Sequence, residues 1–310
     1  MTSDDRGSSS ISTDEGPRSL RSEDEAGPRQ KRKQLPLWQE TILLLGVALV
    51  LAIVLKTFFV QAFYIPSESM EPGLILNDRI LIQKVSYWGD DEPERGDVVV
   101  FKDPGGWLPP TESAGPSNPV AQVMAKIGLY PTGGHLVKRV IGVAGDTIQM
   151  RRGQVILNGR AIPKQRIADF VLPLTPNYDE AHCDPQFQDN AEGQAVCRYP
   201  RFRETLPGGR SYEVLDQRMT PGVDDTDVYT VPAGHVFLMG DNRDASADSR
   251  FPAPGEALPG QASGMGFIPL ERVQGKAIVT FWSTDGSAEW IKPWTWVSAA
   301  RWDRIGNGFD

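Results

Sequence analysis

The sequence predicts a mainly β fold, in which an antiparallel-sheet domain with an inserted subdomain follows one transmembrane helix. Residues 42–55 (ILLLGVALVLAIVL) form one unbroken apolar run near the N-terminus. The region after it holds short runs rich in β-branched residues and no long stretch with the 3.6-residue period of a helix. The 31 glycines and 25 prolines among 310 residues favour many turns.

Residues 1–37 are expected to form a disordered tail. They are rich in Ser, Asp, Glu, Arg and Gly and contain hardly any large apolar residue, so they cannot bury enough surface to fold. Basic residues crowd the end nearest the apolar run, at Arg29, Lys31, Arg32 and Lys33. By the positive-inside rule, this cluster predicts a cytoplasmic N-terminus with the bulk of the chain outside.

A transmembrane helix is predicted over residues 38–60. The apolar run alone is shorter than the roughly 17–25 residues of a span, but its extension to Val60 reaches that length, with Lys56 reaching to the interface. A cleaved signal peptide is the alternative, because Val60 and Ala62 have the spacing of a cleavage site. The long polar segment before the run and the charge of Lys56 favour a retained anchor.

The predicted β-domain comprises residues 61–160 and 233–295. Within residues 154–160 (QVILNGR), Asn158 and Gly159 predict a hairpin turn. The runs share β-branched residues and Gly, Pro, Asn or Asp at their borders: 79–84, 97–102, 136–141, 147–150, 155–157, 236–239 and 276–281.

Two segments interrupt this domain and one follows it. Residues 104–134 are rich in Pro, Gly and Ser and predict a surface excursion, and residues 161–232 predict an inserted subdomain. Residues 296–310 form a predicted C-terminal tail. The tryptophans between 290 and 302 either pack on the sheet or lie in the membrane interface, where aromatic rings are favoured.

The two cysteines, Cys183 and Cys197, lie in the predicted insertion. This segment is expected outside the cytoplasm, where a disulfide persists, and a bridge closing such a loop stabilises by roughly 3 kcal/mol at most. We favour the bridge over two free thiols. Neither cysteine has the spacing of a zinc site, and no metal or cofactor motif is recognised.

Ser67 and Ser69 lie in a Pro- and Gly-punctuated loop just beyond the predicted membrane face. A serine hydroxyl needs a base to become a nucleophile, and none of the chain's three histidines is marked out as one. In the run 136–141, Lys138 alternates with apolar residues, and burial lowers the pKa of a lysine toward the range of a general base. On local sequence alone, a Lys138 that pairs with an acid or reaches water stays an open alternative. The pattern therefore suggests a serine hydrolase with a lysine base.

Five blocks in order strengthen this interpretation. They are the apolar anchor, 65–72 (IPSESMEP), 95–101 (RGDVVVF), 138–146 (KRVIGVAGD), and 240–250 (GDNRDASADSR) with 266–269 (GFIP). In these blocks the chain resembles the bacterial type I signal peptidases, membrane serine proteases that remove signal peptides from exported preproteins. The resemblance covers residues 38–103, 136–160 and 233–282, so the tail and both excursions fall outside it.

The resemblance implies a Ser-Lys dyad, with Ser69 as nucleophile and Lys138 as general base. It implies that Ser67 contributes to the oxyanion hole beside the Ser69 N–H, and that Ser246 holds the lysine in place. Asp248 and Arg250 would form a supporting ion pair. Shallow apolar pockets for an Ala-x-Ala signal end would be lined by Phe63, Ile65, Pro66, Met70, Leu74 and Val137. Glu68 departs from the small residue frequent in relatives, and its role stays open.

The implied partners are secreted preproteins and membrane lipid, with the export machinery nearby. The implied location is the bacterial cell membrane, single-pass, with the catalytic domain outside. The net charge of −8 gives no reason to expect nucleic-acid binding. One alternative is a repressor-cleaving Ser-Lys autoprotease, which would lack the anchor. Another is a catalytically silent, membrane-tethered β-domain that binds secretion or cell-wall partners, a case that loss of Ser69 or Lys138 would mark.

Overall fold

A computed structural model describes most of the chain after residue 35: residues 36–89, 91–103, 118–119, 122, 133–175, 178, 183–253, 264–289 and 292–309. The predicted tail, up to residue 35, and nearly all of the predicted excursion at 104–134 lie outside the described residues. The chain divides into two compact units, Met1–Val47 and Ala48–Asp310.

Helix α1, Leu37–Val54, is the one helix in the described part that is long and apolar enough to cross a membrane. Its α-helical geometry ends at Val54. A π-helical turn, Leu55–Phe59, follows, and strand β1, Val60–Tyr64, begins directly after it. Val60 pairs with Gln83 across the β1–β2 ladder.

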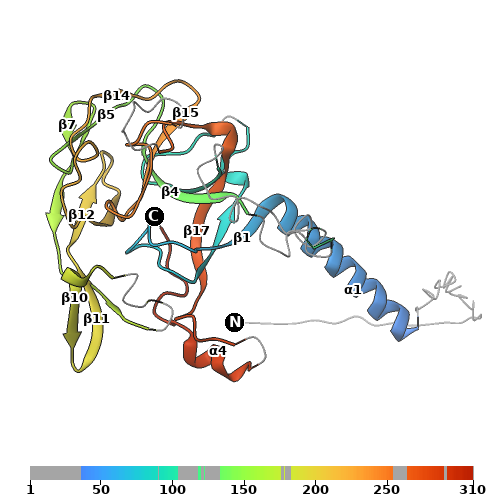
Figure 1. The fold of residues 1–310 in the computed structure, drawn as a ribbon. Helices are drawn as coiled ribbons and strands as arrows, with labels where there is room; N and C mark the ends of the chain where they lie inside the picture. Colours follow the sequence, from blue (N-terminus) through green and yellow to red (C-terminus); the bar gives the residue numbers. More distant parts are fainter. Residues whose placement is uncertain are drawn as a thin grey trace, which may run out of the picture. The chain divides into compact units, whose positions relative to one another are not determined.

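A seven-stranded antiparallel sheet carries the rest of the fold, in the order β1-β2-β17-β3-β4-β15-β16. Strand β17 is long and bulged, and its ladders with β2 and β3 place it inside the sheet (Figure 1). Besides β1, the strands are β2 Asp78–Gln83, β3 Val98–Lys102, β4 His135–Gly142, β15 His235–Met239, β16 Ile268–Pro269 and β17 Val273–Ser283.

Three smaller sheets come from the chain between β4 and β15. Their orders are β14-β5-β6-β7, β13-β12-β8 and β10-β11-β9. Their strands are β5 Thr147–Arg151, β6 Gln154–Leu157, β7 Arg160–Ala161, β8 Lys164–Arg166, β9 Phe170–Pro173, β10 Gln188–Ala191, β11 Gln194–Tyr199, β12 Arg201–Thr205, β13 Ser211–Leu215 and β14 Tyr229–Thr230. In Figure 1, β5, β7 and β14 gather at one end of this region and β10 and β11 at another.

The mainly β prediction is confirmed, and all seven predicted runs lie on strands with borders within a few residues. The largest difference is β17, which begins at Val273 instead of residue 276 and ends at Ser283. The predicted hairpin turn joins β6 to β7, where Leu157 faces Arg160, and both turn residues have positive φ (Asn158 51°, Gly159 74°).

The described C-terminal residues contain a short helix, α4 Trp294–Ala299. Trp302 packs edge-on against Trp282 of β17, with ring centroids 6.0 Å apart, yet it stays 60% exposed. Trp294 is 70% exposed. The remaining short helices are 3-10 turns, η2 Val85–Tyr87, η3 Pro185–Phe187 and η4 Leu270–Arg272.

Candidate active site

Ser69 lies in the segment that joins β1 to β2. The segment folds back on itself through a hydrogen bond from the Glu71 N–H to the Glu68 carbonyl at 3.0 Å. The Ser69 carbonyl accepts a hydrogen bond from the Asn242 N–H at 3.1 Å, which ties the segment to the loop after β15. The side chain is largely covered, since Ser69 is only 9% exposed.

Lys138 lies in the middle of β4, opposite Val99 of β3. It is 3% exposed, and its Nζ donates hydrogen bonds to Ser69 Oγ at 2.6 Å and to the Val137 carbonyl at 3.0 Å. The fold therefore brings the two predicted dyad members into direct contact, although they are 69 positions apart.

The surroundings of Lys138 make its amine easier to deprotonate. Burial lowers the pKa of Lys138 from 10.5 to about 8, while the carboxylates of Asp248 and Asp241 oppose that shift and Arg250 adds to it. With a pKa of about 8, roughly a tenth of the amine is neutral at pH 7, against well under a thousandth for an ordinary lysine. A neutral amine at hydrogen-bond distance can accept the hydroxyl proton.

Ser67 and Ser246 approach the dyad differently. Ser67 is exposed, and its hydroxyl lies 3.3 Å from Ser69 Oγ. Ser246 is 5% exposed and lies close enough to Asp248 to help lower the pKa of that carboxyl. The predicted contact of Ser246 with Lys138 is not among the hydrogen bonds of the described residues; the amine binds Ser69 and Val137 instead.

Asp248 and Arg250 form a buried ion pair, with Nε–Oδ1 at 2.8 Å and Nη2–Oδ2 at 3.0 Å. Burial alone would raise the pKa of Asp248, but the Arg250 guanidinium reverses this and holds it below its usual value. Asp248 also accepts the Gly240 N–H at 3.0 Å. A Cβ at position 240 would overlap both the Ser246 side chain and the Ser69 carbonyl oxygen. Glycine at 240 therefore permits the close approach of these two loops.

Five of the six apolar residues predicted to bind substrate belong to one cluster. Ile65, Met70 and Leu74 are buried at its centre, 1–2% exposed. Phe63 and Val137 are half-buried against them, and Pro66 is exposed outside the cluster. Phe63, Val137 and Pro66 therefore keep some exposed surface, whereas Ile65, Met70 and Leu74 do not.

The described histidines have other surroundings. His135 at the start of β4 packs against Phe63 with tilted rings whose centroids are 5.0 Å apart, and His235 Nδ1 lies 2.9 Å from the Ala233 carbonyl. His182 lies outside the described residues. In the part described, Ser69 Oγ has Lys138 Nζ and Ser67 Oγ as its hydrogen-bond partners.

The sequence analysis missed two buried ion pairs beside the dyad. Arg139, next to Lys138, binds both Asp241 oxygens at 2.8 Å, and Arg243 binds both oxygens of Glu204. All four residues lie in buried positions. Their charges are visible in the sequence, but the partners are 102 and 39 residues apart, so pairing them needs the fold.

Cys183 and Cys197 are joined in a disulfide with a Cα–Cα separation of 5.9 Å.

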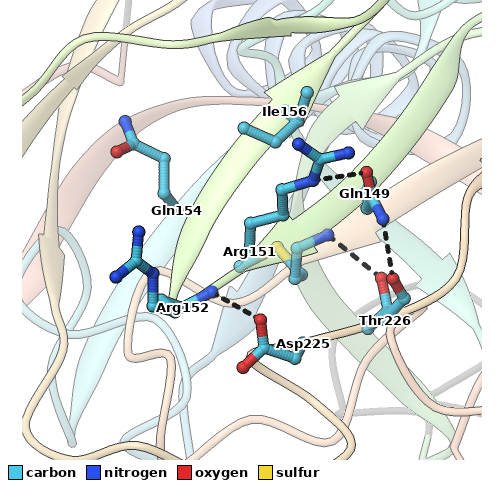
Figure 2. Close-up of a pocket in the computed structure, with 8 residues that line it drawn as sticks. Gln149, Arg151, Arg152, Gln154, Ile156, Asp225 and Thr226 are labelled. Carbon is cyan, nitrogen blue, oxygen red and sulfur yellow. Dashed lines mark hydrogen bonds between the residues drawn. The ribbon is translucent and has the colours of Figure 1, made fainter.

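Elsewhere, the β5–β6 hairpin borders a pocket of about 680 Å³ lined by Arg151, Arg152 and neighbours (Figure 2), which contains neither dyad member. Its polar side chains bond one another and Thr226, so it has the character of an open surface hollow. Among the described residues, no group of three or more His, Cys, Asp or Glu is arranged to hold a metal ion.

Known proteins match most of this chain. A family model described as "Signal peptidase, peptidase S26" matches residues 38–282. A signal peptidase I of Leptolyngbya laminosa is 29% identical, covering 84% of this chain and 87% of the relative. A probable signal peptidase I of Mycobacterium leprae is 30% identical, covering 83% and 80%. A signal peptidase I of Mycobacterium tuberculosis is 31% identical, covering 79% and 72%.

Proposed function

We propose that this chain, which belongs to the signal peptidase family, peptidase S26, as a signal peptidase I, cleaves exported preproteins. The cleavage occurs after an Ala-x-Ala-type signal end and uses a Ser69–Lys138 dyad. Family membership implies preprotein substrates, and together with the apolar helix α1 it indicates membrane anchoring. The observation that carries the dyad is the 2.6 Å hydrogen bond from a buried lysine amine to a serine hydroxyl.

In the first step, neutral Lys138 accepts the proton of the Ser69 hydroxyl. The Oγ forms a bond to the carbonyl carbon of the last signal residue, and the carbonyl oxygen becomes an oxyanion. The short distance between the two side chains supports this direct transfer, since proton transfer needs contact at about 2.6–3.2 Å. The protonated lysine then gives its proton to the departing amine of the mature chain as the peptide bond breaks.

The oxyanion is stabilised by the Ser67 hydroxyl and the Ser69 N–H. The exposed position of Ser67 and its 3.3 Å distance to Ser69 Oγ support this role. One such donor typically lowers the barrier by about 3–4 kcal/mol. Lys138 next takes a proton from water as the water oxygen bonds to the acyl carbon. The lysine then gives this proton to Ser69 Oγ as the ester bond breaks, which frees Ser69 and the signal peptide. The buried Asp248–Arg250 ion pair supports the loop that carries Ser246, whose carbonyl accepts a hydrogen bond from Arg250.

Specificity for small residues follows from the surface beside Ser69. The signal end adds as an extended segment, a common mode of peptide recognition, and its side chains meet Phe63, Pro66 and Val137. An anchor with a cytoplasmic N-terminus holds the enzyme on the membrane that carries its substrate, which raises their effective concentration. The basic cluster before α1 supports this orientation.

The test is cleavage of a preprotein with an Ala-x-Ala signal end by the detergent-solubilised protein, compared with Ser69→Ala and Lys138→Ala. We expect wild type alone to cleave, with N-terminal sequencing of the product placing the cut after the last alanine. A folded wild type without cleavage would favour the catalytically silent alternative. Activity in Lys138→Ala would show that the protein is a peptidase whose general base is a residue other than Lys138.

A further inference from the structure

Glu71, two residues after the proposed nucleophile, has a side chain that the mechanism above does not use. Its carboxyl is fully buried, and its Oε2 accepts a hydrogen bond from the Tyr178 hydroxyl at 3.3 Å, while Oε1 has no hydrogen-bond partner among the described residues. A buried, half-satisfied carboxyl is costly to a fold, so its place beside Ser69 calls for a reason.

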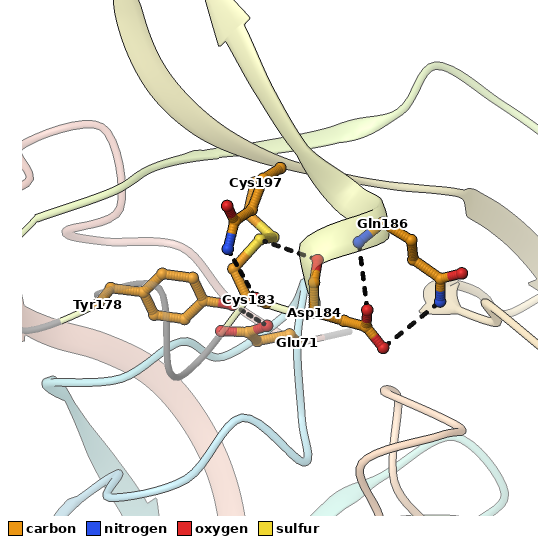
Figure 3. The surroundings of a disulfide bond; sticks show 7 residues. Glu71, Tyr178, Cys183, Asp184, Gln186 and Cys197 are labelled. Atoms are coloured by element: carbon orange, nitrogen blue, oxygen red, sulfur yellow. Dashed lines mark hydrogen bonds between the residues drawn. A yellow bond between two sulfur atoms is a disulfide. The ribbon is translucent and has the colours of Figure 1, made fainter.

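Tyr178 is held in turn by the apolar cluster around the disulfide. This cluster contains the nearby Ile75 and Leu76 of the segment that carries Ser69, together with Tyr178 and both cysteines. Figure 3 shows the Tyr178 ring and the Glu71 carboxyl side by side, close to the Cys183–Cys197 bond. The disulfide therefore packs directly against the far end of the Ser69 segment.

We propose that Glu71, anchored by Tyr178, is a positioning residue for Ser69, and that the Cys183–Cys197 disulfide holds this anchor in place. The inference rests on the proposed function, since it assigns Glu71 a part in setting the distance from Ser69 to Lys138. Glu71 closes the turn that contains Ser69 through the hydrogen bond from its N–H to the Glu68 carbonyl, so a shift of the anchor moves Ser69 Oγ. A displacement of about 1 Å at a reacting atom can reduce the rate roughly a hundredfold.

The charges around Glu71 favour its neutral form. Burial raises the pKa of Glu71 well above its ordinary value, and the neighbouring Glu68 raises it further. The Tyr178 hydroxyl and the more distant Arg304 and Arg301 act in the opposite direction without reversing the shift. A neutral acid is matched in shape and hydrogen bonding by glutamine, so Glu71→Gln is the conservative variant that should keep the anchor.

The experiment compares kcat and KM of the full-length protein in detergent, acting on the Ala-x-Ala preprotein. Glu71→Ala is expected to lower kcat about 10- to 100-fold with KM changed less than about 3-fold. Glu71→Gln is expected to stay within about 3-fold of wild type. Tyr178→Phe and the Cys183→Ser/Cys197→Ser double variant are each expected to lower kcat about 3- to 10-fold, and to add little to Glu71→Ala because the three act through one anchor.

Tyr87→Phe is the matched control, because Tyr87 also donates to a buried carboxylate, Asp97, at 2.9 Å. It is expected to leave kcat unchanged. The second readout is the stability of wild type and Glu71→Gln as a function of pH, which does not depend on activity. In the folded state the pKa of Glu71 lies above its ordinary 4.5, so wild type loses stability relative to Glu71→Gln as pH rises above about 4.5.

Three results would overturn the inference: wild-type kcat in Glu71→Ala, a Glu71→Gln variant as slow as Glu71→Ala, or a wild type and Glu71→Gln that keep the same stability from pH 4 to 8. In each case an active wild type would leave the proposed function intact. An inactive, folded wild type would instead remove the proposed function, and this inference with it.

Discussion

Lys138 and Arg139 are neighbours on β4, and both are almost fully buried, yet they meet opposite surroundings. The Arg139 guanidinium binds both oxygens of Asp241, and although burial lowers its pKa, Asp241 more than reverses that shift. The Lys138 amine binds a hydroxyl and a backbone carbonyl, and burial dominates its pKa. The buried charge of Arg139 is neutralised by Asp241 and holds β4 to the loop after β15. The buried charge of Lys138 has no such direct ion pair among the described residues, so its amine loses its proton more easily.

The largest effect is expected when Lys138 is replaced by arginine, the residue at position 139. Lys138→Arg keeps a cation and hydrogen-bond donors, but a guanidinium does not deprotonate in proteins. We expect kcat for preprotein cleavage to fall by about a thousandfold or more. The control is an unchanged melting profile, and a folded Lys138→Arg variant with near-wild-type kcat would refute a base at this position.

Removing Arg139 should reduce stability more than any other single change in this pair of residues. Arg139→Met leaves Asp241 buried without its cation, which typically destabilises by about 3–5 kcal/mol. Denaturant unfolding in detergent would measure the loss. Arg139→Met/Asp241→Leu should recover most of it, and a double variant as unstable as the single one would show that the pair acts in some other way.

The corresponding change at position 138 should have the opposite sign. The pKa of Lys138 is about 8 when folded and 10.5 ordinarily, so below pH 8 the folded state keeps its lysine charged at a penalty of about 3 kcal/mol. Lys138→Met removes that penalty and loses two hydrogen bonds of about 1 kcal/mol each. We expect a gain of about 1 kcal/mol at pH 7.

This gain should disappear as pH rises from about 8 to 10.5, because the unfolded lysine also loses its proton there. The same denaturant series at pH 7 and pH 10.5 measures it. A Lys138→Met variant that is destabilised equally at both pH values would contradict the depressed pKa.

The smallest expected effect concerns the carboxylate that most favours the protonated lysine. Asp248→Asn removes this charge, so the pKa of Lys138 should fall and the ascending limb of the pH–rate profile should move to lower pH by on the order of one unit. Asp244→Asn is the control, since this buried carboxylate binds the Gln217 and Thr220 segment instead. An ascending limb at the wild-type pH in Asp248→Asn would show that the charge of Asp248 does not raise the pKa of Lys138.

The sequence predicted the local structure well because local patterns determine it. Short β-branched runs gave the strands, and Asn158-Gly159 gave the turn, whose positive φ angles suit these residues. The order of the strands was not predictable, because β17 inserts between β2 and β3 from the far end of the chain. Helical geometry continues through the π-helical turn to Phe59, and β1 begins at Val60, where it pairs with β2.

At the site, residue type and resemblance suggested Ser69 and Lys138, but not their surroundings. The partners of Arg139 and Arg243 depend on loops that meet only in the folded chain. Glu71 carried no signal at all, since a glutamate before a proline in a polar loop is ordinary. Its importance depends on burial and on Tyr178, which is 107 residues away.

The decisive measurement for Lys138 as general base is the pH dependence of kcat/KM for preprotein cleavage, because it reports the pKa of the essential base in the free enzyme. Measured from pH 5.5 to 10 in wild type and in His135→Gln, it should show the same ascending limb near pH 8 in both proteins. A limb near pH 6–7 that vanishes in His135→Gln would assign the base to histidine and contradict the account.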